Sequence, residues 1–456
     1  MSDPIISVSG LRGIVGQSLT PAVAVRYVAA FAAQLPPGPV VVSRDGRPTG
    51  TMLAAAVHST LAASGRTVLD AGVCATPTVG VLVKAKGAAG GVQISASHNP
   101  PEYNGLKLFS DEGRVIPAGP GRAVLEAYRA GKSGWASHDR VGQVQPLEDT
   151  TSDHLRLLLA TVRPEVVVKR SGRVLLDSNA GAGSRLGELL LQALGCEVVV
   201  LGGESNGQFE HPPEPTAENL RGVCQRVVAA RCDLGFCQDP DADRLAIIDE
   251  SGRYLGEEYT LAICLDHVLS PRTGFQPVQQ QTQGIVTNCA TSRMAQDLAK
   301  KYNVPFFRSA VGEANVVDEM LARGAVFGGE GNGGPIDPRV GLVRDSFVGM
   351  AQVLSAMATR DLPVSKLADE LPRYEIRKTT VKLAPEKLPA ALDAVEKLFS
   401  DARANRLDGL RLDWPDRWLI VRGSNTEPIV RVIAEAPTAG VAADLCEQTD
   451  ALLRGI

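Results

Sequence analysis

The sequence predicts an α/β protein with four domains, and three observations support this fold class. The chain has 456 residues, whereas a single hydrophobic core stops growing at roughly 250–300 residues. Short apolar runs alternate with helical patterns around residues 39–95, 173–248 and 283–360, which is typical of three similar layered α/β domains with largely parallel sheets. From residue 371 onward, amphipathic strands beside two helices predict a smaller α+β domain with antiparallel pairing.

The individual elements follow from hydrophobic period and turn residues. In the first repeat we expect a strand at 39–46, a helix at 50–65 and a strand at 67–72. In the second and third repeats we expect a strand with a glycine-rich exit at 173–183, a helix at 185–195, a strand at 196–203, and a strand–helix unit at 283–303. In the last domain we expect strands at 375–383 and 418–436 and helices at 388–404 and 440–455. The predicted domains are 1–150, 151–255, 256–370 and 371–456.

Composition excludes several classes of function. The net charge of −4 provides no basic field for nucleic acid or an anionic membrane, and no apolar run approaches the ~20 residues of a membrane span. The N-terminal residues lack the pattern of a signal peptide. Eight scattered cysteines without a C-x-x-C pair are typical of reduced thiols. We therefore expect a cytoplasmic protein, monomer or homodimer, that binds neither nucleic acid nor membrane.

The first candidate for chemistry is a serine at the end of an apolar strand. Residues 95–101 read Ser-Ala-Ser-His-Asn-Pro-Pro directly after an apolar run. Such a loop either holds a serine hydroxyl in a rigid exit from the strand or is a simple turn. A catalytic pair of Ser97 and His98 is a poor interpretation, because adjacent side chains point apart and the G-x-S-x-G elbow is absent.

The second candidate is the alternating set Asp239, Asp241 and Asp243. In an extended loop all three carboxylates can converge, and they then repel each other unless a cation lies among them. Oxygen ligands favour Mg²⁺ or Ca²⁺. An EF-hand is excluded because its sixth position requires glycine and is Arg244 here, and because a strand follows where a helix is needed. The alternatives are a magnesium loop with Arg244 facing an anion, and a solvated acidic loop.

Three further loops carry weaker signals. A glycine-rich loop around Glu330 and Asn332 lets a backbone approach a ligand, but alone it favours an ordinary turn. Arg12 lies between two glycines, which is equally compatible with a turn and an anion contact. A dense group of donors near the C-terminus suits a phosphate or an ordinary turn; it contains Arg422, Ser424, Asn425, Thr426 and Arg431.

Taken together, these motifs resemble those of the α-D-phosphohexomutase family, which includes phosphoglucomutase, phosphomannomutase and phosphoglucosamine mutase. SASHNP resembles the family's phosphoserine loop, DPDADR its Mg²⁺ loop, GEGNGG its sugar loop, RGSNTEP its phosphate loop and GLRG its N-terminal loop. The resemblance covers essentially the whole chain. It implies four domains around a central cleft and the movement of phosphate between O6 and O1 of a hexose through a hexose 1,6-bisphosphate, which also acts as activator.

The resemblance also implies roles for the candidate residues. Ser97 carries the phosphoryl group and, with the three aspartates, binds Mg²⁺. Lys107 matches a lysine proposed as general acid–base, with a phosphate counter-ion as the alternative. Arg12 and Arg244 stabilise the transferred group, and His98 orients the loop or contacts the phosphate. The remaining residues bind the sugar and the non-reacting phosphate of a hexose phosphate: Glu330, Asn332, Arg422, Ser424, Asn425, Thr426 and Arg431.

Several positions depart from the family's pattern. Pro240 replaces a glycine in the metal loop, Asn332 replaces the usual serine of the sugar loop, and Gly334 replaces its histidine. A lysine expected at Ala310 is also absent, with Arg308 nearby. The identity of the general acid–base thus stays open. Because the GEGNGG form resembles archaeal-type phosphoglucosamine mutases, we expect glucosamine as the main sugar, with mannose and glucose also accepted. An Mg²⁺-dependent sugar phosphatase or a non-catalytic sugar-phosphate sensor remains the alternative class.

Overall fold

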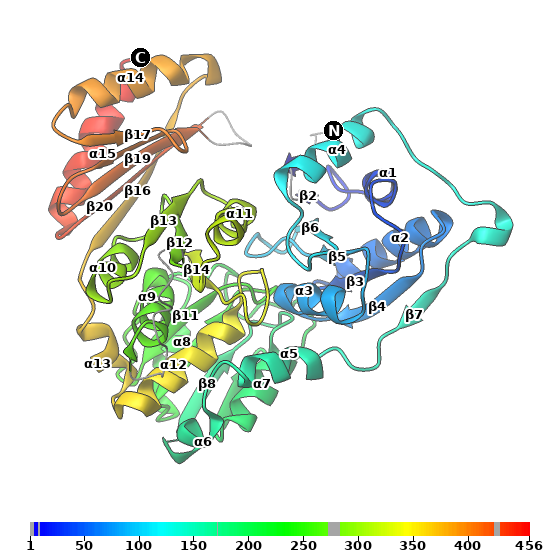
Figure 1. The fold of residues 1–456 in the computed structure, drawn as a ribbon, viewed down its shortest axis with the longest axis horizontal. Helices are drawn as coiled ribbons and strands as arrows, with labels where there is room; N and C mark the ends of the chain where they lie inside the picture. The colour runs from blue at the N-terminus through cyan, green and yellow to red at the C-terminus, as the bar shows by residue number, and fades with distance from the viewer. Residues whose placement is uncertain (1–3, 8–9, 171, 272–282, 424–428) are drawn as a thin grey trace. The chain divides into compact units, whose positions relative to one another are not determined.

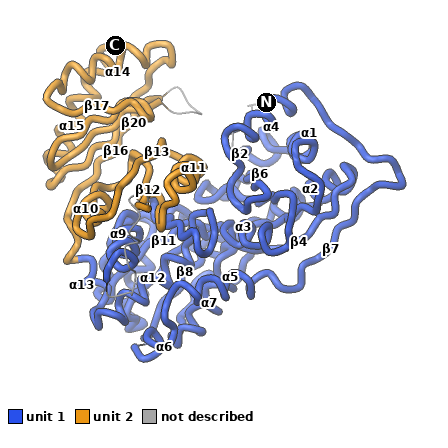
Figure 2. The backbone as a smooth tube through the Cα atoms, in the orientation of Figure 1, with its two compact units in different colours: residues 1–276, 332–368 blue, residues 277–331, 369–456 orange. Residues whose placement is uncertain are grey.

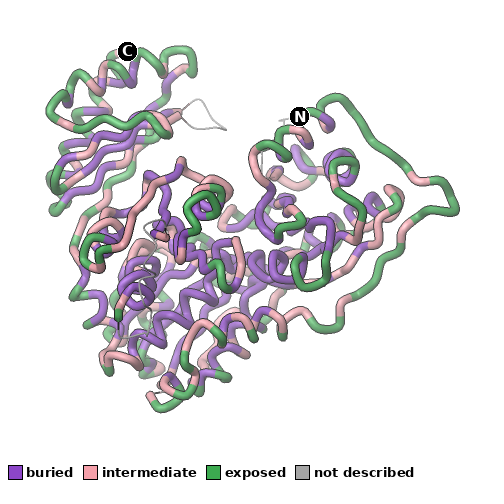
Figure 3. Tube along the Cα trace, viewed as in Figure 1, coloured by how far each residue is buried: buried purple, intermediate pink, exposed green. Residues whose placement is uncertain are grey.

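The computed structural model describes residues 4–7, 10–170, 172–271, 283–423 and 429–456. It divides into two compact units, shown in separate colours in Figure 2: unit 1 comprises residues 1–276 and 332–368, and unit 2 comprises residues 277–331 and 369–456. Buried residues follow the strands of each unit, as Figure 3 shows. In the described part of the chain, no helix is both long and apolar enough to cross a bilayer.

Unit 1 begins with a mixed seven-stranded sheet in the order β1-β2-β6-β5-β3-β4-β7 (Figure 1). Its strands are β1 (Ile5–Ser7), β2 (Gly10–Ile14), β3 (Val40–Arg44), β4 (Val68–Val73), β5 (Gly90–Ile94), β6 (Tyr103–Ser110) and β7 (Val144–Pro146). Its helices are α1 (Pro21–Ala32), α2 (Thr49–Ala63), α3 (Thr76–Ala85), α4 (Ala118–Arg129) and the short 3₁₀ helix η1 (His138–Arg140). The strands predicted at 39–46 and 67–72 are observed as β3 and β4, and the helix predicted at 50–65 is observed as α2.

The sheet is less parallel than the sequence predicts. Strand β5 is parallel to β3, but β6 runs antiparallel to both β5 and β2. The reason is the length of the connection between β5 and β6, residues 95–102. A loop this short can only reverse the chain, since a parallel crossover needs a dozen or more residues. The serine loop is therefore the tip of a hairpin.

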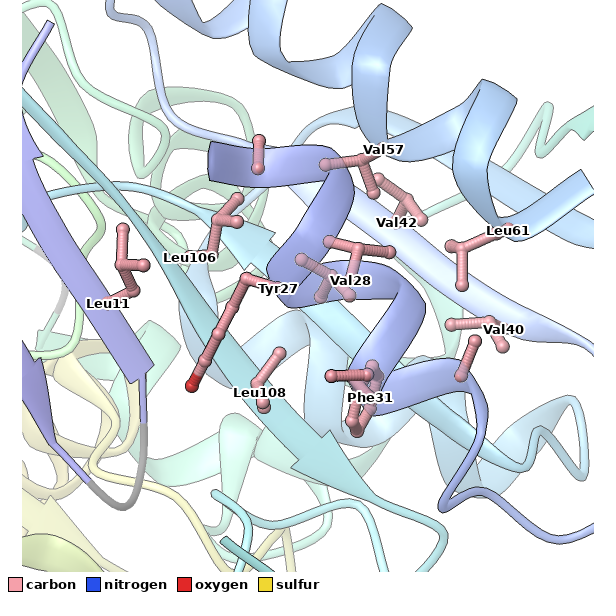
Figure 4. Close-up of a cluster of buried hydrophobic side chains, with 14 of the residues drawn as sticks. Leu11, Tyr27, Val28, Phe31, Val40, Val42, Val57, Leu61, Leu106 and Leu108 are labelled. Atoms are coloured by element: carbon pink, nitrogen blue, oxygen red, sulfur yellow. The ribbon is translucent and has the colours of Figure 1, made fainter. Parts of the chain in front are cut away.

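The first core lies between α1 and the sheet. Thr20 caps α1 by accepting a hydrogen bond from the backbone N–H of Val23 at 3.3 Å. Figure 4 shows side chains of α1 in one buried cluster with Leu106 and Leu108 of β6. Each such burial contributes roughly 1.5–3 kcal/mol. Because side chains alternate along a strand, Lys107 between these two leucines projects from the opposite face.

The second α/β domain of unit 1 has a four-stranded sheet in the order β11-β10-β8-β9. Its strands are β8 (Arg173–Asp177), β9 (Glu197–Leu201), β10 (Leu234–Gln238) and β11 (Leu245–Asp249). The helices of this part of the chain are α5 (Ser152–Leu159), α6 (Pro164–Val167), η2 (Val168–Arg170), α7 (Ser184–Ala193), α8 (Arg221–Ala229), α9 (Glu257–Val268), α12 (Ser346–Arg360) and α13 (Val364–Asp369). Strands β10 and β11 are antiparallel because only the six residues 239–244 connect them. Strand β15 (Gly334–Ile336) precedes α12 and also belongs to unit 1.

Unit 2 contains a parallel set of strands and an antiparallel sheet. Strand β12 (Ile285–Asn288) pairs in parallel with β13 (Phe306–Ser309) and β14 (Phe327–Glu330), with helices α10 (Met294–Lys301) and α11 (Glu313–Arg323) between them in the chain. The C-terminal sheet has the order β16-β20-β19-β18-β17. Its elements are β16 (Glu375–Lys382), η4 (Pro385–Lys387), α14 (Leu388–Leu398), β17 (Arg403–Asn405), β18 (Leu410–Asp413), β19 (Trp418–Gly423), β20 (Ile429–Ala436) and α15 (Ala439–Arg454).

The helix predicted at 388–404 is too long. Helix α14 ends at Leu398, and residues 403–405 pair with β18 as strand β17. Asp401 in the connecting turn accepts a hydrogen bond from the indole N–H of Trp414 at 2.8 Å. This tertiary contact fixes the turn and overrides the local helical pattern.

Candidate active site

Ser97 lies at the tip of the β5–β6 hairpin in a strained backbone conformation. Its φ is +50°, in the left-handed region that non-glycine residues rarely adopt, and its side chain is 2% exposed. The hydroxyl Oγ donates to Oδ2 of Asp239 at 2.7 Å, and His98 Nδ1 lies 3.3 Å from Oγ. The serine singled out from the sequence thus meets an aspartate 142 positions away in the chain.

A buried arginine that the motifs did not suggest holds this loop. The guanidinium of Arg47 donates to the backbone carbonyls of residues 97, 99, 100 and 103 at 2.6–3.1 Å, and to Oδ2 of Asp45 at 3.1 Å. Ser95 also holds the loop. Its hydroxyl donates to Asp45 Oδ2 at 2.6 Å and accepts a hydrogen bond from Ser97 N–H at 2.9 Å. Burial raises the pKa of Asp45 to about 6, although Arg47 acts in the opposite direction. Together, the contacts of Arg47, Asp45 and Ser95 fix the path of the loop and the orientation of Ser97.

The metal loop brings three carboxylates together beside Ser97. Asp239, Asp241 and Asp243 are fully buried, and one oxygen of each lies within 4.8 Å of the others. Oδ1 of Asp239 accepts hydrogen bonds from the backbone N–H groups of Asp243 and Arg244, both at 3.1 Å, which folds the loop back on itself. The bend needs a left-handed residue at Ala242, with φ of +58°.

Two carboxylate oxygens of this cluster are left without hydrogen bonds. Oδ1 of Asp241 and Oδ1 of Asp243 are buried and have no hydrogen-bond partner. The other oxygen of each is occupied: Thr76 Oγ1 donates to Asp241 Oδ2 at 2.5 Å, and Lys107 Nζ contacts Asp241 Oδ2 at 3.2 Å and Asp243 Oδ2 at 2.8 Å. Buried, unpartnered carboxylate oxygens are costly in a protein. Their arrangement with Asp239 fits a divalent cation with oxygen ligands.

The electrostatic environment differs between the carboxylates of the cluster. Burial, followed by repulsion from Asp241 and Asp243, raises the pKa of Asp239 well above its usual range. Burial opposes ionisation of Asp243 as well, but the charges of Arg344 and Lys107 outweigh it and lower its pKa. Among the residues described, this is the one carboxylate, cysteine or histidine cluster with metal-ligand spacing. A divalent cation here would let all three carboxylates ionise.

The predicted cations surround the same cluster. Arg12 in β2 donates to Asn99 Oδ1 at 3.1 Å, and Arg244 Nε lies 3.8 Å from Asp243 Oδ1. Burial, followed by the charges of Arg244 and Arg12, lowers the pKa of His98 to about 3, so its ring is neutral near pH 7. A neutral imidazole beside Ser97 can orient a hydroxyl or a phosphate but adds no charge.

In unit 2, Glu330 is buried and firmly positioned. Its Oε1 accepts from Asn288 Nδ2 at 2.7 Å and from Gly312 N–H at 3.1 Å. The next residue donates its N–H to Thr291 Oγ1 at 3.1 Å. Glu330 is thus fixed by two loops that follow neighbouring strands.

The C-terminal phosphate loop is described only in part. Ser424, Asn425 and Thr426 lie outside the described residues. Arg422 at the end of β19 donates through Nε to Asp408 Oδ2 at 3.0 Å, and Val311 N–H donates to the same oxygen at 3.0 Å. Asp408 therefore links Arg422 to the loop that also holds Glu330.

The three remaining positions considered in the sequence analysis each lie in a different environment. Arg431 in β20 is exposed. Asn332 belongs to unit 1, and its side-chain oxygen is buried without a hydrogen-bond partner. Arg308 donates to Gln296 Oε1 at 2.6 Å and lies over the ring of Phe306.

The residues that the motifs missed are mostly partners of motif residues from distant segments. They are Asp45, Arg47, Thr76, Asp408 and Arg344; Ser95 lies within the SASHNP motif itself. Only Asp45 and Arg47, which come directly after a buried strand, offered a local signal. For the others, the partner lies tens to hundreds of positions away.

Family models match the chain in four consecutive segments. The phosphoglucomutase/phosphomannomutase α/β/α domain I matches residues 4–134, domain II 153–252, domain III 257–374 and the C-terminal domain 379–452.

Curated relatives and a solved structure agree with these matches. The chain is 33% identical over 444 residues to a probable phosphoglucosamine mutase of Methanopyrus kandleri, covering 96% of this chain and 95% of that one. It is 34% identical over 445 residues to a phosphoglucomutase/phosphomannomutase of Thermococcus kodakarensis, covering 96% of each. A crystal structure of a phosphoglucomutase/phosphomannomutase family protein from Burkholderia thailandensis superimposes with a TM-score of 0.85 at 26% identity, covering 99% and 97% of the two chains.

Proposed function

Because the chain belongs to the phosphoglucomutase/phosphomannomutase family and is a phosphohexomutase, we propose that Ser97 is its phosphoryl carrier. The observation that supports this most directly is the 2.7 Å contact between Ser97 Oγ and Asp239, beside the two carboxylate oxygens without hydrogen bonds. A hydroxyl at that point places a bound phosphoryl group next to a cation on the aspartates. Mg²⁺ held by Asp239, Asp241 and Asp243 would neutralise charge on the transferred group.

The reaction moves one phosphoryl group in each direction. The bond between Ser97 Oγ and phosphorus breaks as a hydroxyl of the hexose monophosphate forms a new O–P bond. Ser97 Oγ takes a proton from Lys107 Nζ, and the proton released by the sugar hydroxyl returns to that amine. The product is a hexose 1,6-bisphosphate and free Ser97. After the bisphosphate reorients in the site, its other phosphoryl group is transferred to Ser97 Oγ, and the isomeric monophosphate leaves.

Lys107 is the residue we assign to proton transfer. Its ammonium contacts two carboxylates, at 3.2 and 2.8 Å, which favours the protonated form. It can therefore hold a proton at Nζ for the departing Ser97 oxygen and also balance phosphate charge. Arg12 and Arg244 are assigned to the equatorial oxygens of the transferred group.

The sugar and the distal phosphate are assigned to unit 2. Glu330, held by Asn288 and Gly312, is the proposed acceptor for sugar hydroxyls. Arg422, with the loop that follows it, is the proposed grip on the non-reacting phosphate. We propose glucosamine phosphate as the main substrate because the GEGNGG loop resembles that of archaeal-type phosphoglucosamine mutases. Mannose and glucose phosphates should also be accepted, because no assigned residue reads the substituent at C2. We also propose hexose 1,6-bisphosphate as activator and the cytosol as compartment; the eight cysteines are free thiols.

A coupled assay tests this function. The 1-phosphates of glucosamine, mannose and glucose are supplied separately with Mg²⁺ and hexose 1,6-bisphosphate. All three should turn over, with kcat/KM spread over no more than about 10²-fold, since a site without a partner for a group discriminates weakly. The bisphosphate should stimulate turnover without net release of inorganic phosphate. Stoichiometric phosphate release would identify a phosphatase, and a preference above about 10⁴ would reveal a residue that reads C2.

Removing the metal tests the cation assignment. Chelation should abolish turnover, and added Mg²⁺ should restore it. Circular dichroism should show an intact fold after chelation, because the loop lies between strands of complete cores. Unfolding on chelation, or equal turnover with Ca²⁺, would contradict a catalytic magnesium loop.

A further inference from the structure

The cation that contacts Asp243 from outside the sequence motifs is Arg344. Its Nη2 lies 2.7 Å from Asp243 Oδ2, and its side chain is 9% exposed. Lys107 Nζ contacts the same oxygen at 2.8 Å. Two positive groups thus bind one oxygen of this carboxylate, while Oδ1 is buried without a hydrogen bond. This contact sets which oxygen of Asp243 faces the proposed cation.

The backbone that carries Arg344 is rigid. The next residue, Asp345, caps helix α12 by accepting from Phe347 N–H at 2.8 Å, and its own N–H donates to Pro335 O at 2.9 Å. Asp345 Oδ2 also contacts Nε2 of the fully buried His154 at 2.8 Å. The root of the Arg344 side chain is therefore fixed on three sides, so its guanidinium has a defined direction.

The path of the side chain passes directly over Gly334. A Cβ added at Gly334 would lie 2.4 Å from Cδ, 2.8 Å from Cγ and 3.0 Å from Cβ of Arg344. Real Cβ atoms essentially never approach other heavy atoms below 3.0 Å. Gly334 does not need positive φ, so its glycine is explained by space for the arginine. A side chain at 334 and Arg344 in this conformation exclude each other.

We propose that Arg344 is a positioning residue of the metal and phosphoserine site, and that Gly334 is glycine in order to admit it. The guanidinium holds Oδ2 of Asp243, so that Oδ1 faces the cation beside Ser97. This assignment rests on the proposed function. It also explains why a histidine at 334, expected from the family's pattern, is incompatible with the site in this chain.

The first test measures metal binding without any sugar. Mn²⁺ binding to purified Arg344→Gln is followed by electron paramagnetic resonance and compared with the wild type. Loss of a group that orients a metal ligand costs roughly 10–100-fold in affinity, so the dissociation constant should rise by that factor. The half-saturating Mg²⁺ for turnover should rise in parallel. Arg344→Lys keeps the positive charge but loses the planar guanidinium, so it should recover part of the affinity. It replaces Arg344→Gln in the comparison if that variant is insoluble.

The second test is a double-mutant cycle between Gly334 and Arg344. Gly334→Ala should weaken Mn²⁺ binding much as Arg344→Ala does, because the new Cβ displaces the arginine. In the Arg344→Ala background, Gly334→Ala should cost less than about twofold, since the space is then free. This non-additivity distinguishes a positioning contact from general damage to the fold.

Controls separate this inference from the proposed function. Arg360→Gln, on the far end of α12 with an ion pair to Asp266 at 3.6 Å, should leave Mn²⁺ binding unchanged. Wild-type Mn²⁺ affinity in both Arg344→Gln and Gly334→Ala would overturn the inference, as would additive effects in the cycle. Absence of mutase turnover in the wild type would sink the proposed function instead, because the binding measurement needs no substrate.

Discussion

The loops that carry Ser97 and the aspartates differ from the ligand loops of unit 2 in how they are held. In unit 1, the ion pair that holds the serine loop is buried: the side chains of Arg47 and Asp45 are 1% and 0% exposed. In unit 2, Asp408 and Arg422 meet through side chains that are 19% and 13% exposed. Buried ionic contacts fix a group and cannot be exchanged for water without a large penalty. Partly exposed ion pairs are weaker, and their side chains can adapt.

This difference matches what each region has to do. Charge develops at the phosphoryl group during transfer, and fixed donors there stabilise it without reorganising. The proposed role of the unit 2 residues is to bind parts of the substrate that do not react, in either of two orientations of the bisphosphate. Glu330 is also buried, at 4% exposed, and its contacts include the neutral donors Asn288 Nδ2 and Gly312 N–H. Variants in the first region should therefore reduce kcat, and variants in the second should mainly raise KM.

The largest effect is expected for Ser97→Ala. Removing a covalent nucleophile costs on the order of 10⁶ in kcat in serine proteases, and a loss of at least 10⁴ is expected here. Intact-mass and peptide analysis of wild-type protein should find phosphate at Ser97, and the variant should have none. Ser59→Ala, an exposed serine of α2 whose hydroxyl bonds only within its helix, is the matched control. Near-normal turnover of Ser97→Ala in preparations free of other mutases would refute the assignment.

The next effect is expected for Arg47→Met, which keeps much of the volume but removes the guanidinium. Four carbonyls lose a donor and Asp45 is left as a buried charge without its partner, which costs roughly 3–5 kcal/mol in the free energy of unfolding. Because the serine loop would no longer be held in its conformation, kcat should fall by about 10²-fold or more. Denaturant unfolding and steady-state kinetics measure the two effects. Arg44→Met, whose guanidinium reaches only the neighbouring carbonyl of Asp45, should change each far less.

A smaller effect of a different kind is expected for Asp408→Ala. Arg422 and Val311 N–H both lose their acceptor, and a hydrogen bond to a charged group is worth roughly 1.5–3 kcal/mol. KM for the hexose phosphate should rise about tenfold or more, with kcat within about threefold of wild type. Asp393→Asn, an exposed carboxylate paired with Arg406, should leave both constants unchanged. A fall in kcat at unchanged KM would contradict the contrast between the two regions.

The smallest effect is expected for His211→Gln, which removes a partly buried ion pair of unit 1 outside the site. His211 Nε2 is 2.8 Å from Asp177 Oδ2 and Nδ1 is 2.9 Å from Pro212 O. Both partners are acceptors, so both ring nitrogens donate and the ring is charged. Burial lowers the pKa of His211, but the hydrogen bond and charge of Asp177 outweigh it and raise the pKa above its ordinary value.

The sign of the pH dependence follows from this shift. A raised pKa in the folded state stabilises the protein fully below the unfolded pKa of about 6.5, and this stabilisation is lost as pH rises through the folded pKa. Wild type should exceed His211→Gln by roughly 1–2 kcal/mol in urea unfolding at pH 5.5. The gap should shrink by pH 9, while kcat/KM stays within about twofold. A gap that widens with pH would mean that the ring is neutral in the folded protein.

The sequence predicted most of the elements of the fold and the contiguous motifs of the candidate site, but not the distant partners of those motifs, for a physical reason. Strands such as β3 and helices such as α2 are visible because their period and turn residues are local. Ser97 and the aspartates are visible because each motif is contiguous. Arg344 and Arg47 were missed because their roles depend on residues distant in the sequence. Arg344 contacts Asp243, 101 positions away, and Arg47 contacts carbonyls of the serine loop. The antiparallel hairpins were missed because a pattern of apolar runs does not state the direction of pairing.

The contact between Thr76 and Asp241 also bears on the order in which the site forms during synthesis. Thr76, at the start of α3, binds Asp241 twice, through Oγ1 at 2.5 Å and through a backbone bond at 2.9 Å, and so joins the first α/β domain to the metal loop of the second. Domains fold in order as a chain leaves the ribosome. When the first domain is complete, the serine is in place but the carboxylates are not yet synthesised. The emerging chain therefore passes through a stage in which the proposed nucleophile is in place but inactive, and the site is completed only when Asp243 contacts Lys107.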